Sequence, residues 1–185
     1  MLPSKLLING ALVEGAMQLD VVNPATGKPF ATIARANAGQ LEEAVAAAKA
    51  AGPGWAALGC AARGEYLTKL ADAIEANKDE FAKLLTAEQG KPLKQATGEV
   101  IGGIYQLRHY AAQRMEPVTL RETDTARIIE HRTPLGVVAA ITPWNFPFMM
   151  VTQKLGPALI TGNTVVAKPA PTTPMCALKI AELAA

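Results

Sequence analysis

Two short stretches of the sequence carry side chains that suit ligand chemistry, and each directly follows an apolar run. Residues 142–145 offer backbone amides, the indole of Trp144 and the carboxamide of Asn145. Residues 168–171 offer the cation of Lys168. An indole, a carboxamide and a cation suit a polar, phosphorylated or dinucleotide ligand. We therefore predict a nucleotide-like ligand here, provided that the fold brings the two stretches together.

Other residues that could carry chemistry show no spacing that supports a site. The sequence contains no GxGxxG segment and no Walker-type phosphate loop. Cys60 and Cys176 are far apart, without CxxC spacing or a histidine at ligand spacing, so we expect reduced, packed thiols and no metal site. His109 and His131 have no serine, cysteine or carboxylate at useful spacing, so we assign them no catalytic role.

The elements around the two ligand stretches predict one supersecondary unit. Residues 136–141 and 164–167 are continuous β-prone apolar runs, as expected of strands that are buried on both faces. Each run is followed by a helix, at about 147–160 and about 173–185. This order indicates parallel strands with a right-handed crossover. Because the carboxyl ends of parallel strands meet at one edge of a sheet, the two ligand stretches should lie side by side.

The pattern before this unit is different. The first thirty-five residues predict short strands separated by turns, including a tight hairpin turn at Asn9-Gly10. A helical period begins at Ala38, and we expect Gly52-Pro53-Gly54 to end the first helix. Three more helices are predicted at 63–76, 78–86 and 92–115. Glycines within the last of them, at positions 98, 102 and 103, are expected to mark close helix contacts.

These patterns divide the chain into three parts. Residues 1–117 form strands and a helical block, and 118–135 form a β-hairpin region. Residues 136–185 form the strand–helix–strand–helix unit of a dinucleotide-binding domain. The predicted fold class is α/β, an incomplete Rossmann-like parallel sheet preceded by a helical block and a β-hairpin. Because two parallel strands do not complete a domain, we expect the sequence to be interrupted within its last helix.

Composition excludes several classes of protein. The 185 residues are 50% hydrophobic and 18% charged, which is typical of a globular protein with a real core. The net charge of +2 is scattered, so we expect no nucleic-acid partner. No apolar stretch is long enough for a membrane span, and residues 1–9 do not have the pattern of a secretory signal. Together with the cysteine usage, this predicts a cytoplasmic protein.

Four segments resemble one known family. Residues 141–147 (ITPWNFP) and 162–169 (GNTVVAKP) resemble the paired signature of the NAD(P)-dependent aldehyde dehydrogenase superfamily. Residues 23–27 (NPATG) and 88–92 (EQGKP) are similar to its N-terminal landmarks, in the expected order. The resemblance runs from Leu6 to Ala185 and concerns the N-terminal portion only. It implies oxidation of an aldehyde to an acid through a thiolate adduct, with hydride transfer to nicotinamide.

The resemblance also implies roles for individual residues. Asn145 would donate a side-chain N–H to the oxyanion of the adduct, and Lys168 would hydrogen-bond the adenosine ribose. The residues that would line the cofactor are Ile141, Thr142, Pro143 and Trp144. Plainer alternatives remain open for all of them. Asn145 would then cap the following helix, Lys168 would be a solvated strand-end lysine, and the other four would be a packed strand end.

Two departures from the family pattern affect what the chain can do. Many NAD-preferring members carry a glutamate three residues after the lysine. Pro171 stands there and can neither bond a ribose 2′-hydroxyl nor repel a 2′-phosphate. NAD and NADP are therefore both candidate cofactors, with a slight preference for NAD. The family's nucleophilic cysteine loop and its base, in a Glu-Leu-Gly-Gly-Lys segment, are not found in these 185 residues.

We therefore expect the chain to carry the oxyanion donor and part of the cofactor site, and to be inactive alone. An aldehyde would be the small-molecule substrate of the complete enzyme. The alternative is a stand-alone non-catalytic product, or a partner that associates with complete subunits. The hairpin at 118–132 resembles an intersubunit element of the family, so we expect self-association or a homo-oligomer.

Overall fold

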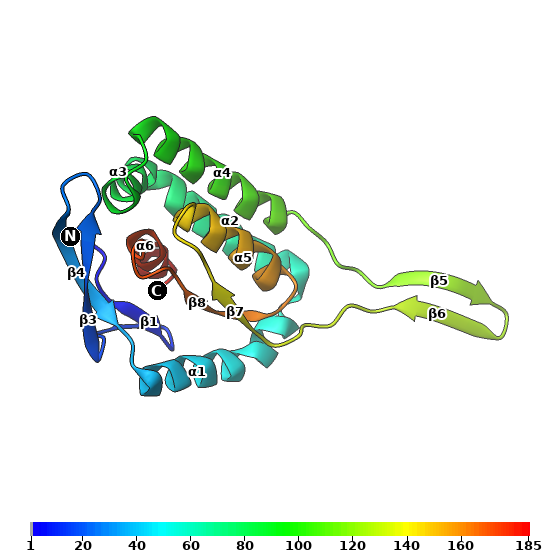
Figure 1. Cartoon of the computed structure of the whole chain (residues 1–185). Coiled ribbons are helices and arrows are strands. Elements are labelled where there is room, and N and C mark those ends of the chain that lie inside the picture. Colours follow the sequence, from blue (N-terminus) through cyan, green and yellow to red (C-terminus); the bar gives the residue numbers. More distant parts are fainter. Residues whose placement is uncertain (1) are drawn as a thin grey trace.

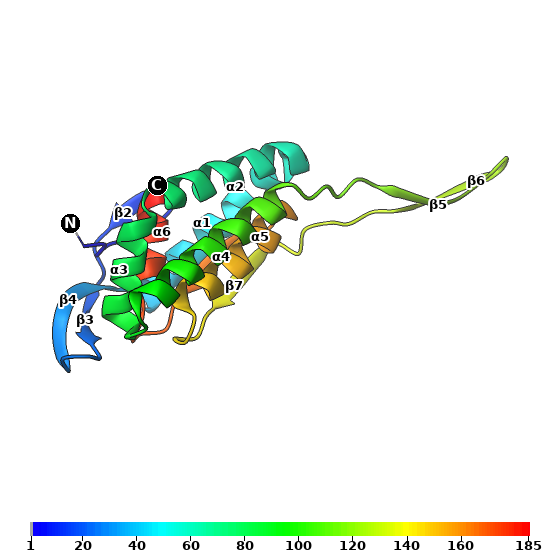
Figure 2. The same ribbon diagram turned by 90° about the horizontal axis from the view of Figure 1, so that it is seen from above.

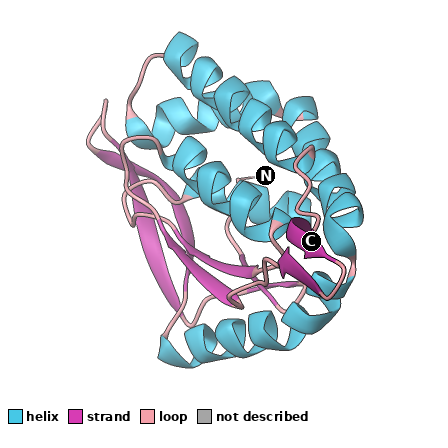
Figure 3. Cartoon of the chain, turned by 90° about the vertical axis from the view of Figure 1, so that its right-hand side faces the viewer, coloured by secondary structure: helices cyan, strands magenta, loops and turns pink. Residues whose placement is uncertain are grey.

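The structure, a computed structural model, describes residues 2–185. Its centre is a parallel pair of strands, β7 (Val137–Ile141) and β8 (Thr164–Lys168). Helix α1 (Ala38–Ala57) runs along one side of this pair, and α5 (Pro147–Ile160) lies on the other side with most of the remaining helices (Figure 1, Figure 3). This layering of helices around a parallel pair confirms the predicted α/β class.

The N-terminal strands form two separate antiparallel pairs. Strands β1 (Leu6–Ile8) and β2 (Ala11–Val13) are joined by Asn9 and Gly10, whose φ values are 51° and 74°. Left-handed conformations at both central residues are what a tight hairpin turn requires, so the predicted Asn-Gly turn is confirmed.

The second pair contains a strand that the sequence pattern does not predict. Strands β3 (Met17–Asn23) and β4 (Lys28–Arg35) pair along their whole length, with a register shift after Val21. Only Val21 is fully buried in β3, and most of its other side chains are exposed. The alternation is therefore too weak to indicate a strand, and pairing with β4 decides its conformation.

Helix α1 is longer than predicted. Asn37 caps its first turn by accepting from the Gln40 amide at 2.9 Å, and the Gln40 side chain accepts from the Asn37 amide in return. The helix then continues through Pro53 to Ala57, so the predicted stop at residues 52–54 is wrong. Proline costs the helix one hydrogen bond. A tertiary contact holds the extra turn, because the Trp55 indole donates to the Leu159 carbonyl oxygen at 3.0 Å.

The next three helices form a bundle with α5. Their bounds are Gly59–Ala76 for α2, Lys78–Gln89 for α3 and Leu93–Ala111 for α4. The bundle core is fully buried and includes Leu67, Phe81, Leu85, Leu107 and Phe148. The predicted fourth helix is four residues too long at its C-terminal end, since α4 ends at Ala111. No helix of residues 2–185 is both long and apolar enough to cross a membrane.

A two-stranded hairpin projects from the rest of the molecule. Strands β5 (Val118–Thr123) and β6 (Ala126–Glu130) pair with each other alone, as the sequence predicts. Two perpendicular views show them extending beyond the helices (Figure 1, Figure 2). Every side chain of β5 is exposed, and so are Ile128 and Ile129 of β6.

The central pair is less buried than predicted. Strand β7 has Ala140 buried, but Ala139 is exposed and Ile141 is 69% exposed, so burial on both faces is wrong for this strand. The physical reason is that β8 is its sole partner strand within residues 2–185, and nothing covers the end of that face. Helix α6 (Met175–Ala184) follows β8, as predicted, but begins two residues later than expected.

Helices α4 and α5 approach each other closely at Gly103 of α4 and at Gly156 of α5, where a methyl group would stand 2.6 Å from Tyr110 Cδ2. A methyl group at Gly103 would stand 2.4 Å from Phe148 Cε1 and 2.8 Å from Thr152 Oγ1. The predicted role of a close-contact glycine is therefore confirmed at Gly103. It is wrong at Gly98, where a methyl group would meet no atom within 4 Å, and at Gly102 the nearest atom, Met149 Cε, is at ordinary contact distance, 3.7 Å.

Gly103, which is in close contact, and Gly98, which faces open space, allow a matched test of helix packing. We expect Gly103→Ala to lower the free energy of unfolding by roughly 1–3 kcal/mol, because α4 and α5 must separate. Gly98→Ala should raise it by up to about 1 kcal/mol, because alanine favours a helix and the site is open. Urea unfolding followed by circular dichroism measures both. Equal effects of the two substitutions would contradict the close contact at Gly103.

Candidate functional site

The two predicted ligand stretches lie side by side. Ile141, the last residue of β7, is paired in the parallel ladder with Lys168, the last residue of β8. The ladder continues one step further, since the Thr142 amide donates to the Lys168 carbonyl oxygen at 3.1 Å. The two stretches therefore leave the same edge of the sheet as neighbours. This is the crevice position at which open α/β sheets bind ligands.

Most of the predicted site residues are exposed at this edge. Ile141 is 69% exposed and Trp144 is 60% exposed, while Pro143, Asn145 and Lys168 are also on the surface. Thr142 is buried instead, and its hydroxyl oxygen has no hydrogen-bond partner. The Lys168 ammonium is exposed and donates to the neighbouring Pro169 carbonyl oxygen at 3.4 Å. Large apolar side chains beside an exposed cation and an unpaired buried hydroxyl fit a ligand that has both a flat apolar part and polar groups, as a nucleotide does.

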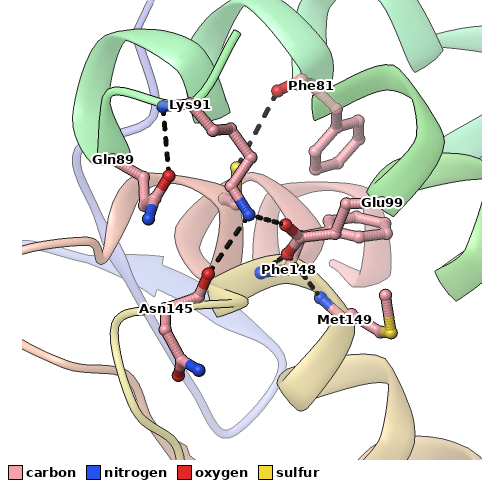
Figure 4. A network of polar contacts seen from close by, with 8 residues as sticks. Phe81, Gln89, Lys91, Glu99, Asn145, Phe148 and Met149 are labelled. Atoms are coloured by element: carbon pink, nitrogen blue, oxygen red, sulfur yellow. Dashed lines mark hydrogen bonds and ion pairs between the residues drawn. The ribbon is translucent and has the colours of Figure 1, made fainter. Parts of the chain in front are cut away.

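Asn145 does not cap the helix that follows it. The residue before α5 is Phe146, and it makes no side-chain capping bond. The amides of Phe148 and Met149 donate instead to one oxygen of Glu99, each at 3.1 Å. The capping alternative for Asn145 is therefore wrong. Figure 4 shows its backbone carbonyl turned toward Lys91, while its carboxamide points away from this network.

Lys91 completes the network around the turn. Its ammonium group pairs with Glu99, donates to the Asn145 carbonyl oxygen at 3.1 Å, and lies 4.3 Å from the centre of the Phe146 ring. The side chain of Lys91 is 9% exposed and that of Glu99 is 1% exposed. The turn that carries Asn145 is thus attached to α4 and to the loop before it by buried, charged hydrogen bonds.

A second buried glutamate holds the start of α6. Glu88, at the end of α3, accepts from the Met175 amide at 2.7 Å and from the Cys176 amide at 3.1 Å. Burial raises the pKa of Glu88 from its ordinary value of 4.5 to about 7, although these hydrogen bonds favour the charged form. The sequence pattern predicts a structural role for neither Glu88 nor Glu99. The available signal was an acid on an apolar helix face, Glu88 next to the turn of Leu84 and Leu85.

These carboxylates change what the helix N-termini can bind. In many dinucleotide sites the pyrophosphate lies on a helix N-terminus. Here the first amides of α5 and α6 already donate to Glu99 and Glu88, so they are not free to bind a phosphate. A dinucleotide at this edge must therefore place its phosphates elsewhere, which agrees with the missing glycine-rich phosphate loop.

Neither cysteine is positioned to react with a ligand at this edge. Cys176 is fully buried, and burial raises the pKa of its thiol well above the ordinary value, so its predicted packing role is confirmed. The Cys60 sulfur lies 3.6 Å from the carbonyl oxygen of Ile160, the last residue of α5. Asn145 precedes the first turn of α5, so about 20 Å of helix separates it from Cys60.

The remaining candidates contribute nothing to the edge. His109 is exposed and stacks on Tyr105, with ring centres 6.5 Å apart, and His131 is exposed as well. Within residues 2–185 no group of three or more histidine, cysteine or acidic side chains is arranged to hold a metal ion.

The buried carboxyl of Glu88 predicts a pH effect on stability. A raised pKa in the folded state means that the folded chain binds the proton more tightly than the unfolded chain, so this group destabilises the fold as the pH rises. We expect wild type to lose about 3 kcal/mol of unfolding free energy relative to Glu88→Gln between about pH 5 and about pH 8. Urea titrations of both proteins across this range measure the difference. A difference that is constant with pH would rule out a raised pKa.

Comparison with known proteins supports a single family. The family model described as the aldehyde dehydrogenase family matches residues 12–185. The chain is 41% identical to mitochondrial succinate-semialdehyde dehydrogenase of Arabidopsis thaliana, over 90% of this chain and 32% of that protein. It is 41% identical to glutarate-semialdehyde dehydrogenase of Pseudomonas aeruginosa, over 98% of this chain and 40% of that protein.

Solved structures agree with the sequence matches. PnpE in complex with nicotinamide adenine dinucleotide superposes with a TM-score of 0.92 and 40% identity, covering 98% of this chain and 38% of that one. An NADP-dependent enzyme of E. coli superposes with a TM-score of 0.94 and 38% identity, covering 99% of this chain and 39% of that one. The chain thus spans about two fifths of the length of these relatives or less. It belongs to the aldehyde dehydrogenase family and corresponds to the N-terminal part of its members.

Proposed function

We propose that this chain supplies the oxyanion donor and part of the NAD(P) cleft for oxidation of an aldehyde to a carboxylic acid. The chemistry would take place in a polypeptide that also carries the remaining part of the family fold. The observation that supports this most directly is the state of Asn145. Its backbone is fixed by Lys91, and its exposed carboxamide is used neither as a helix cap nor in the network.

Each residue of the edge has a part in the proposal. The carboxamide of Asn145 donates an N–H to the oxygen that becomes negative when a thiolate attacks the aldehyde carbon. Lys168 would hold the adenosine ribose. The residues that would line the cofactor, through backbone groups and packing, are Ile141, Thr142, Pro143 and Trp144. Bound nicotinamide would supply the chemistry of accepting a hydride. The thiolate and the general base would come from the remaining part of the family fold.

We propose NAD(P) as the cofactor class, with NAD as the first choice. Position 171 is a proline, so no carboxylate there repels the 2′-phosphate of NADP. A relative from Escherichia coli, 39% identical over 96% of this chain, is named for NADP(+), so both cofactors belong in the test.

Several relatives are named for succinate or glutarate semialdehyde, which makes succinate semialdehyde the first substrate to test. The two free cysteines suit the proposed cytoplasmic location.

The role of Asn145 can be tested by two substitutions in the complete polypeptide. Asn145→Ala should lower kcat about 100- to 1000-fold, because one oxyanion donor is lost, while cofactor affinity stays nearly unchanged. Asn145→Asp keeps the shape of the side chain but lacks the donor, so its loss should be at least as large. Steady-state kinetics with NAD and with NADP measure both. Weaker cofactor binding with an intact kcat would mean that Asn145 serves the cofactor and not the oxyanion.

The 185-residue chain alone should show no aldehyde oxidation with either cofactor, because Cys176 is buried and Cys60 lies far from Asn145. The competing proposal is a stand-alone non-catalytic product or a partner of complete subunits. Turnover by the purified chain that disappears in a Cys176→Ser variant would contradict our assignment of this thiol.

We also propose that the chain self-associates through the hairpin of β5 and β6. Val118, Leu120 and Ile128 are at least 50% exposed, and the hairpin edges have no strand partner within residues 2–185. Exposed apolar strand edges pair with other chains.

Light scattering after size-exclusion chromatography should therefore give a mass above 19.4 kDa. Leu120→Lys should shift the population toward the monomer, because a charge on the hairpin opposes pairing. Leu41→Lys is the matched control, since Leu41 is 52% exposed but lies on α1. A chain that is monomeric at every concentration would refute self-association.

A further inference from the structure

Lys91 and Glu99 contact the chain on the two sides of Pro147, where the turn of Asn145 passes into α5. Lys91 donates to the carbonyl oxygen of Asn145 on one side of Pro147. Glu99 accepts from the amides of Phe148 and Met149 on the other side. The ion pair joins the two contacts, so the segment between them is attached at one point to the loop before α4 and at the other to α4 itself (Figure 4).

The fold alone does not require charges at this place. A buried ion pair contributes little net stability, because desolvation of both groups opposes their attraction. A neutral acceptor at position 99 could still receive the two amides of α5, which is all that a helix cap needs. Lys91 adds a different contact, to a backbone oxygen outside the helix and to the ring of Phe146, 4.3 Å away. Its hydrogen bond to the peptide that follows Asn145 fixes the backbone from which the carboxamide projects.

We infer that Lys91 and Glu99 are positioning residues for Asn145. Lys91 holds the carbonyl group of Asn145, Glu99 holds both Lys91 and the first turn of α5, and the carboxamide is thereby kept in one direction. This inference rests on the proposed function, in which that carboxamide donates to the oxyanion. Positioning of this kind affects the transition state more than cofactor binding, and small displacements of a catalytic group are costly.

The choice of variants must separate positioning from folding. Lys91→Met alone leaves the buried carboxylate of Glu99 without a partner and so risks unfolding. The double variant Lys91→Met/Glu99→Gln removes both charges, keeps an acceptor for the amides of α5, and deletes the contact to the Asn145 carbonyl. Lys94→Met is the matched control, since Lys94 is an exposed lysine in the first turn of α4.

The first measurement uses the chain itself. Hydrogen–deuterium exchange by mass spectrometry should show several-fold faster exchange at residues 148–150 of the double variant, because the amides of Phe148 and Met149 donate to Glu99 and the amide of Met150 donates to the Phe146 carbonyl oxygen at the end of the turn. Exchange in α2 and α3 should match wild type, and Lys94→Met should match wild type throughout. Unchanged exchange at residues 148–150 in a folded double variant would overturn the inference, because the turn and the first turn of α5 would then be ordered without Lys91.

The second measurement uses the complete polypeptide. The double variant should lose roughly 10- to 100-fold in kcat with little change in the KM for NAD(P), and Asn145→Ala added to it should cost much less than in wild type. An unchanged kcat in the double variant, with Asn145→Ala still inactivating, would overturn the inference and leave the proposed function intact. A wild-type polypeptide that oxidises no aldehyde would overturn the proposed function and this inference with it.

Discussion

The candidate site depends on two carboxylates buried inside the helical block. A helix begins with amides that have no partner within the helix, and burial of these amides is costly unless an acceptor is supplied. In α5 and α6 the acceptors come from other helices, Glu99 of α4 and Glu88 of α3. Each helix start is thus placed by a side chain far away in the sequence. Because α5 and α6 follow β7 and β8, the same two contacts fix where the loops at the sheet edge end.

Helix α5 is held at both ends with complementary charge. Glu99 lies at its N-terminus, and the buried Arg63 donates to the carbonyl oxygen of Ile160, its last residue, at 3.0 Å. A negative charge at the start and a positive charge at the end of a helix both interact favourably with its dipole. Gly103 lets α4 approach between these ends. The helix next to the Asn145 turn therefore has little freedom to slide or tilt, which suits a residue whose direction matters.

The caps that α3 and α4 supply to α6 and α5 also distinguish this edge from the common dinucleotide site. Glu88 and Glu99 occupy the helix amides that a phosphate would otherwise use, so the polar groups that would remain for the proposed cofactor are Lys168, the Thr142 hydroxyl and backbone groups. Ile141 and Trp144 would supply the apolar contact, since both side chains are large and mostly exposed. In the proposed function, the cofactor would therefore be held mainly by its nucleoside parts and by apolar contact.

Local pattern was sufficient for much of this molecule. Apolar periodicity and turn residues predict the parallel β7–α5–β8–α6 unit and the hairpin of β5 and β6. They also predict that residues 142–145 and 168–171 leave the same sheet edge, because strands joined through a helix run parallel and end on the same side. Family motifs were specific enough to name the family. Three features required the tertiary structure. Helix α1 continues through Pro53 because Trp55 bonds to Leu159, strand β3 forms because β4 pairs with it, and Asn145 is not a cap because Glu99 takes that role. Each is a contact between residues distant in sequence, and such contacts leave little trace in the spacing of neighbouring residues.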